Sequence, residues 1–203
     1  MDTRTGEPKR NEKMIRSVDT LKELYTVAVG VALVMAVETL AKEDATAPVF
    51  GRDSFFLFLV VVVTLIPFYH GAFRHMDDIY IFPEAPRKRP GPRVLLVDYL
   101  LLMFEAGLLV WLATSISNLV IFTQGFVFLM AVDVLWAAVT GILTPAKSVF
   151  KWGILNFIVG VTLFAVSYWP GHSPIQAPAL CAIAIVRSAL DYWLSRRLYF
   201  PED

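Results

Sequence analysis

The sequence lacks most of the features by which small soluble proteins are recognised. Its 203 residues include one cysteine, Cys181, so a disulfide framework and a cysteine-based metal site are excluded. The 18 basic and 18 acidic residues cancel to a formal net charge of zero. Bulk charge therefore indicates no particular partner, and we expect no binding to nucleic acid.

Catalytic motifs are missing as well. The sequence holds no His-Glu-x-x-His, Gly-x-Ser-x-Gly or phosphate-loop pattern. His172 and Ser173 are adjacent, but no third member of a catalytic triad accompanies them. His70 and His75 are five residues apart, which puts them about 140° apart around a helix and disfavours a haem held by both. We predict no cofactor and no metal site, and an enzyme is the less favoured class without being excluded.

Charge is scarce in six long stretches of a chain that is 57% hydrophobic. These stretches cover residues 25–41, 55–73, 94–114, 119–143, 152–169 and 177–194. Each is close to the roughly 17–25 residues with which a helix crosses a bilayer. Because lipid offers the backbone no hydrogen bonds, such segments are expected to be helical. The sequence predicts an all-α integral membrane protein, with a cytoplasmic segment over 1–24, a six-helix transmembrane domain over 25–199 and a tail over 200–203.

Basic residues indicate the orientation of these spans, because Lys and Arg are retained on the cytoplasmic side of a membrane. An inward N-terminus places 15 of the 18 in the cytoplasm, namely Arg4, Lys9, Arg10, Lys13, Arg16, Lys22, Arg74, Arg87, Lys88, Arg89, Arg93, Lys147, Lys151, Arg196 and Arg197. Only Lys42 and Arg52 then lie outside, while Arg187 lies within a span. We predict that both termini are cytoplasmic and that the protein resides in the plasma (inner) membrane.

Two cytoplasmic segments could contact other molecules. Apolar residues ahead of the first span recur on one helical stripe, namely Met14, Val18, Leu21 and Tyr25. This stripe predicts an amphipathic helix lying on the inner leaflet. The proline-rich connector over 83–93 carries four basic residues, Arg87, Lys88, Arg89 and Arg93. They could bind anionic lipid or a cytosolic protein partner, although charges that only fix the topology are the favoured explanation.

Seven polar side chains within the predicted spans form a candidate ion pathway. At about 1.5 Å per residue along a helix, three of them lie near the midplane, namely Glu105, Asp133 and Arg187. The other four lie in the cytoplasmic half, namely His70, Asp98, Asn156 and Asp191. A charge at the centre of a spanning helix costs about 2.5–3.5 kcal/mol on insertion scales, so such residues usually face the bundle and pair. We therefore predict that these side chains converge.

Spacing within the spans supports this convergence. Asp98 and Glu105 are seven residues apart and share one helix face, and the same holds for Arg187 and Asp191, which are four apart. A third polar stripe leaves the membrane along the second span and consists of His70, Arg74 and Asp77. The three stripes predict a polar track from the midplane to the cytoplasm.

Proline and glycine residues predict irregular and close-packed positions in the bundle. Pro67 and Gly71 predict a kink or a loosened backbone in the second span. Five other glycines are predicted points of close helix packing, namely Gly30, Gly107, Gly125, Gly153 and Gly160. Such points are also compatible with a homo-oligomer, which the sequence leaves open.

The buried arginine suggests a function for the polar track. Arg187 against two midplane carboxylates, Asp133 and Glu105, leaves a surplus negative charge that a proton or another cation would balance. We predict a membrane channel or transporter for a small cation, with the proton as the best candidate, and a cytoplasmic exit formed by Asp98, Asp191 and His70. The alternative is a non-catalytic membrane subunit or effector, whose cytoplasmic face binds a partner protein and whose buried charges only lock the helices together.

Overall fold

Six long helices make up the computed structural model, which describes residues 6–42, 52–82, 90–144, 149–167 and 175–196, with side chains from residue 12 onward. The helices are α1 (Gly6–Ala41), α2 (Asp53–Met76), α3 (Pro92–Thr114), α4 (Leu119–Leu143), α5 (Val149–Ser167) and α6 (Gln176–Leu194). A short π-helical segment, η3 (Asp77–Ile81), continues directly from α2. Each of the six long helices is long and apolar enough to cross a membrane. The predicted all-helical chain with six such helices is confirmed at this level.

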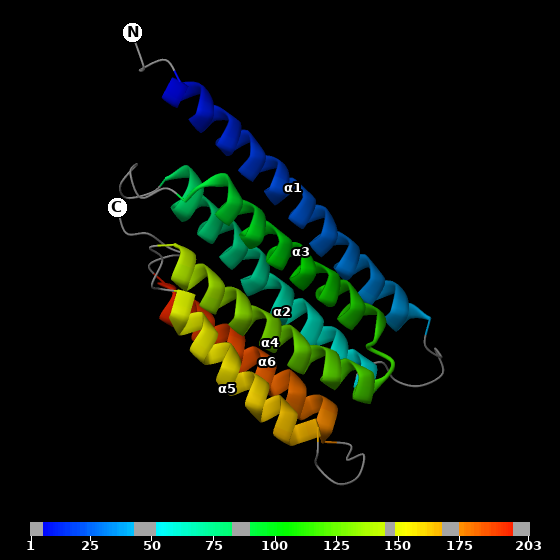
Figure 1. The fold of residues 1–203 in the computed structure, drawn as a ribbon. Helices are drawn as coiled ribbons and strands as arrows, with labels where there is room; N and C mark the ends of the chain where they lie inside the picture. The colour runs from blue at the N-terminus through cyan, green and yellow to red at the C-terminus, as the bar shows by residue number, and fades with distance from the viewer. Residues whose placement is uncertain (1–5, 43–51, 83–89, 145–148, 168–174, 197–203) are drawn as a thin grey trace.

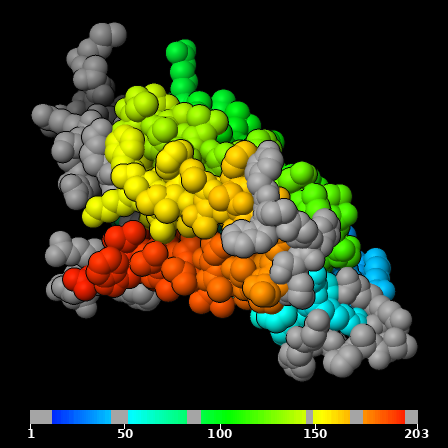
Figure 2. All heavy atoms as spheres, turned by 90° about the horizontal axis from the view of Figure 1, so that it is seen from below, coloured from blue at the N-terminus to red at the C-terminus, as the bar shows by residue number. Residues whose placement is uncertain are grey.

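The helices run side by side as a bundle whose neighbours follow the order α1, α3, α4, α5, α6 and α2 (Figure 1). The helix α2 also touches α3 and α4, and therefore leans toward the middle of the bundle. Figure 2 shows α6 and α5 next to each other along one face, with α4 on the other side of α5. Because the bundle has an even number of traversals, α1 begins and α6 ends at the same end.

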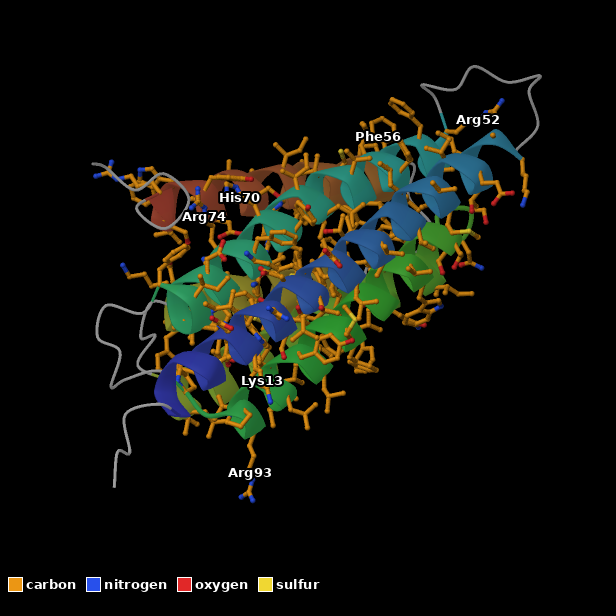
Figure 3. The ribbon with its side chains drawn as sticks, turned by 90° about the horizontal axis from the view of Figure 1, so that it is seen from above. Lys13, Arg52, Phe56, His70, Arg74 and Arg93 are labelled. Atoms are coloured by element: carbon orange, nitrogen blue, oxygen red, sulfur yellow. The ribbon has the colours of Figure 1, made fainter. Side chains whose placement is uncertain are left out.

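Charged side chains distinguish the two ends of the bundle. Lys13, Arg74 and Arg93 lie toward the end at which α1 begins, and Arg52 lies at the opposite end (Figure 3). We call the first the basic end and the second the far end. At the basic end α3 begins with Pro92, where the missing N–H of proline costs no helical hydrogen bond. At the far end Asn118 caps α4 by accepting a hydrogen bond from the Ile121 amide at 3.1 Å.

Apolar side chains cover the outside of the bundle as well as its core. Large exposed hydrophobic residues occur on every helix, for example Val34, Ile66, Leu100, Phe157 and Trp193. A water-soluble protein rarely exposes a continuous apolar surface of this kind. The interior near the far end is also apolar, because Leu57, Leu112, Ile116, Phe122 and Phe126 are buried there and pack in one hydrophobic cluster.

The first helix differs from the expected arrangement. We predicted that its amphipathic start lies on the inner leaflet, but α1 is one straight helix that continues this segment into the first span (Figure 1). Its apolar stripe faces protein: Val18 is fully buried and packs in a cluster with Met76, Tyr80 and Leu95. The buried part of the stripe, Val18 and Tyr25, is therefore covered by protein, whereas Met14 and Leu21 stay partly exposed.

Pro67 lies within α2 without ending it. Proline has no N–H, so the carbonyl of Val63 four residues earlier lacks its helical partner. The hydroxyl of Ser188 on α6 donates to this carbonyl at 3.0 Å. In apolar surroundings, side chains of neighbouring helices often satisfy backbone groups that a proline frees. The position at which Pro67 was predicted to loosen the backbone is thus a contact point between α2 and α6.

Three of the five predicted packing glycines lie at close contacts. A Cβ added to Gly153 would lie 3.1 Å from Cβ of Ala137, and one added to Gly160 would lie 3.3 Å from Cβ of Met130. Both contacts join α5 to α4, and Gly125 makes a third close contact with Leu112. The prediction is wrong for Gly30 and Gly107, since a Cβ there would meet no atom within 4 Å.

The replacement Gly153→Leu is expected to destabilise the protein by about 1–3 kcal/mol, because the added side chain overfills the α4–α5 contact. The matched control is Gly107→Leu, which adds the same side chain to an exposed position with free space around it. Thermal unfolding in detergent should show a lower Tm for the first variant only. Equal Tm values would mean that α4 and α5 separate easily at this point.

Candidate functional site

Four buried polar side chains on four helices form a chain of hydrogen bonds across the middle of the bundle. The Arg187 Nε group donates to Oδ1 of Asn156 at 2.9 Å. The amide nitrogen of Asn156 donates to Oδ2 of Asp133. A further side-chain hydrogen bond joins Asp133 to Glu105. We call these four residues, together with Asp191, the central carboxyl site.

The bond between Asp133 and Glu105 sets the charge of this site. A carboxylate only accepts hydrogen bonds, so two carboxyl groups can bond to each other only when one of them carries a proton. Both side chains are almost completely buried, and two ionised carboxylates at such a distance from water would repel each other strongly. We therefore expect the pair to hold at least one proton and at most one negative charge.

Arg187 makes its ion pair with a different acid from the one expected. We predicted that Arg187 holds Asp133, Glu105 or both, but its Nη1 lies 3.5 Å from Oδ2 of Asp191, one turn along the same helix. Its guanidinium carbon also lies 4.7 Å from the centre of the Phe68 ring. The amide of Asn156 lies between Arg187 and Asp133, so the arginine reaches the carboxyl pair through this amide.

A cavity of about 30 Å³ adjoins the central carboxyl site, and all five residues of the site line this cavity. Trp136, Trp152 and Phe68 form aromatic walls. A polar cavity can hold a water molecule when it has about 10–15 Å³ of space for water centres. Among the described residues, Oε1 of Glu105 has no hydrogen-bond partner. Nη1 of Arg187 also has no hydrogen-bond partner there, although it forms the ion pair with Asp191. The site therefore combines room for water with groups that can bind it.

Asp98 forms a second polar site nearer the basic end, separate from the first. Four donors surround its carboxylate, two at each oxygen. They are His75 Nε2 at 2.8 Å, the Tyr80 hydroxyl at 3.1 Å, Trp136 Nε1 at 2.6 Å and the Thr140 hydroxyl at 3.0 Å. We call these five residues the Asp98 site. The donors come from α2, η3 and α4, so the carboxylate ties four segments of the chain together.

The sequence did not reveal the partners of Asp98. His75 was set aside as a haem ligand and given no other role, yet it is the histidine that points into the bundle. His70 contacts the Tyr192 hydroxyl at 3.2 Å and is only partly buried between α2 and α6. The predicted stripe of His70, Arg74 and Asp77 does not continue as one track, because His70 contacts Tyr192 of α6 whereas Asp77 bonds to Lys22 of α1. The sequence did contain one relevant signal. The five-residue spacing puts His70 and His75 on different faces of the helix, so only one of them can point into the bundle.

Trp136 separates the two polar sites. Its indole N–H donates to Asp98, while the residue also lines the cavity beside Glu105. Of the seven predicted pathway residues, Glu105, Asp133, Asn156, Arg187 and Asp191 come together around this cavity. Asp98 and His70 do not line the cavity.

The basic connector lies mostly outside the described residues. Arg87, Lys88 and Arg89 fall there, so the lipid- or partner-binding prediction remains a prediction for them. Arg93 is exposed at the start of α3 and points away from the bundle (Figure 3). Within the described ranges, no group of three or more His, Cys, Asp or Glu side chains is arranged to hold a metal ion.

The replacement Asp98→Ala is expected to cost about 3–5 kcal/mol of stability, because it leaves four buried donors without their acceptor. Glu38→Ala serves as the control: Glu38 is exposed near the end of α1 and contacts Lys42 at 3.4 Å, so its loss should cost less than about 1 kcal/mol. Both values are measurable by chemical or thermal unfolding in detergent. Similar losses in the two variants would show that Asp98 does not hold these segments together.

Comparisons with known proteins identify no family for this chain. No protein-family model, no curated protein and no solved structure matches the chain. The function must therefore be argued from the two polar sites and from the surface of the bundle.

Proposed function

We propose that the chain is inserted in the plasma (inner) membrane, with both termini in the cytoplasm, and that it transports a small cation, the proton being the favoured one. Six apolar helices with apolar outer faces support insertion, because exposed hydrophobic side chains are stable against lipid and unfavourable in water. The described Lys and Arg side chains support the orientation. Lys13, Arg16, Arg74, Arg93 and Lys151 gather toward the basic end, as the positive-inside rule requires of a cytoplasmic side.

The observation that carries the transport proposal is the hydrogen-bonded carboxyl pair of Glu105 and Asp133. Intramembrane carboxyl groups are costly and usually mark proton or ion pathways. This pair holds one proton, has a positive charge within the same hydrogen-bonded chain and adjoins a cavity with room for water. It can therefore gain or lose a proton without leaving an isolated charge in the core.

The apolar packing near the far end favours a transporter over an open channel. Leu57, Leu112, Phe122 and Phe126 fill the interior there. A proton on the carboxyl pair is thus separated from the outer side by close-packed hydrocarbon. Release to that side would need a rearrangement of helices, as in alternating access around a fixed midplane site.

One observation favours the alternative, in which the buried charges are structural. The Asp98 carboxylate is fully bonded, which is typical of a helix-locking group and leaves it no free position for a moving proton. We therefore assign Asp98 a structural role and keep the central carboxyl site for transport. A non-catalytic subunit that binds a protein partner would need neither Glu105 nor Asp133 as a titrating group.

Proton flux through purified protein in liposomes tests the proposal. Under an imposed membrane potential, Glu105→Gln and Asp133→Asn should each lower the flux by about a hundredfold or more, because each removes a group that takes up the proton. Glu38→Gln is the control, since it removes an exposed carboxylate outside the central site. Potassium flux, measured in the same vesicles, identifies the transported ion.

Two results would contradict transport. The first is a wild-type protein that moves neither protons nor potassium. The second is a pair of variants that lose thermal stability while flux stays at the wild-type level. The partner-binding alternative predicts instead that neutralising Arg87, Lys88, Arg89 and Arg93 abolishes function in cells while Glu105→Gln and Asp133→Asn are tolerated.

Orientation can be tested by labelling single added cysteines, since the native Cys181 is buried. In a Cys181→Ala background, Lys42→Cys should react with a membrane-impermeant maleimide on intact cells. Lys13→Cys and Arg93→Cys should react only in inside-out vesicles, because the positive charge near them retains this end in the cytoplasm. Reaction of the Lys13 variant on intact cells would invert the proposed topology.

A further inference from the structure

Tyr25 on α1 has a buried hydroxyl group without a hydrogen-bond partner among the described residues. The residue is 3% exposed, and its ring stacks on Tyr69 with centroids 6.4 Å apart. Buried hydroxyl groups nearly always have a partner, because the loss of water must be compensated. An isolated hydroxyl at this depth therefore requires an explanation.

Glu105 supplies the matching group. Its Oε1 atom is also buried without a partner, and α3, which carries Glu105, packs along α1. Leu102 and Ala106, which flank Glu105 on α3, pack in the same buried cluster as Tyr25, so the two unpartnered atoms belong to neighbouring parts of the core. One unpartnered atom can donate a hydrogen bond and the other can accept it.

A second cavity, of about 10 Å³, extends from Tyr25 toward the basic end. It lies between α1, α2 and α3, and its lining includes Lys22 and Tyr99. Ala72 and Leu102 line both this cavity and the larger one beside Glu105. Tyr25 lines the second cavity, and Lys22, which is ion-paired with Asp77, lines it on the cytoplasmic side of Tyr25.

We propose that one water molecule bridges the Tyr25 hydroxyl and Oε1 of Glu105 by hydrogen bonds, and that this bridge relays protons between the carboxyl pair and the cytoplasmic side. This inference rests on the proposed proton transport. A hydronium ion on the Lys22 side gives a proton to the tyrosine oxygen, and the hydroxyl's own proton passes to the bridging water. That water passes one of its protons to Oε1 of Glu105, while the proton on Oε2 of Glu105 passes to Asp133. Each transfer breaks one O–H bond and forms one, the tyrosine stays neutral, and the carboxyl pair goes from one proton to two.

The test uses Tyr25→Phe, which removes the hydroxyl and keeps the stacked ring. Tyr69→Phe is the matched control: it removes a hydroxyl from the ring stacked on Tyr25, whose own contact is with Thr26 at 3.3 Å. Two quantities are measured in full-length protein in liposomes. One is proton flux, and the other is the infrared carbonyl band of the protonated carboxyl that disappears in Glu105→Gln.

The expected result is a loss of proton flux of about a hundredfold in Tyr25→Phe, the lower end of the contribution of a positioned proton-transfer group. The carbonyl band should also shift to higher frequency, because Glu105 loses a hydrogen bond. Tyr69→Phe should change neither quantity, and both variants should keep the wild-type Tm.

An unshifted band in Tyr25→Phe overturns the contact between Tyr25 and Glu105. A shifted band with wild-type flux overturns the relay and leaves the proposed transport intact. A wild-type protein without flux removes the transport proposal and the relay together, and in that case the band alone decides whether Tyr25 belongs to the carboxyl site.

Discussion

The hydrogen bond between the carboxyl groups of Glu105 and Asp133 is the constraint around which the bundle is arranged. It brings two acids from adjacent helices together in an interior that is otherwise mostly hydrocarbon. Such a contact is stable only when a proton is shared and the remaining charge is compensated. Asn156 and Arg187 supply that compensation from α5 and α6, so four helices must keep a fixed register for one charge to be tolerated.

The two buried polar sites differ in how completely their bonds are satisfied. Asp98 accepts four hydrogen bonds, and its geometry leaves little freedom for a change of protonation. The central carboxyl site has a free oxygen on Glu105 and a cavity beside it. A satisfied network rigidifies a core, whereas a partly satisfied one is a place where water, protons or conformational change enter. This contrast underlies the division between a structural and a functional site.

Backbone irregularities position both sites. Pro67 frees a carbonyl that Ser188 binds, which fixes α6 against α2 next to Arg187. The π-helical turn after α2 brings Tyr80 to Asp98 and Asp77 to Lys22. Extra residues of this kind in a helix occur frequently at functional positions. Here η3 bonds to both α1 and α3 at the basic end, close to where we infer the entry path for protons.

The sequence by itself determined the class of fold, because six stretches of spanning length with few charges are readable without any tertiary contact. It also identified most of the central site. A charge in a long apolar stretch needs a partner, and helical spacing correctly put Arg187 and Asp191, as well as Asp98 and Glu105, on shared inward faces.

Only the tertiary structure decided which side chains meet. Periodicity along one helix says nothing about the rotation of its neighbours, so the sequence could not show that Asn156 lies between Arg187 and Asp133. It could not show that His75, in preference to His70, turns inward, since the spacing separates their faces without telling which face meets α3 and α4. The spacing places Tyr25 on an apolar stripe. The same spacing fits a tyrosine that only packs in the core and one whose buried hydroxyl belongs to a polar site. Partner choice between helices depends on their packing, which the linear pattern does not contain.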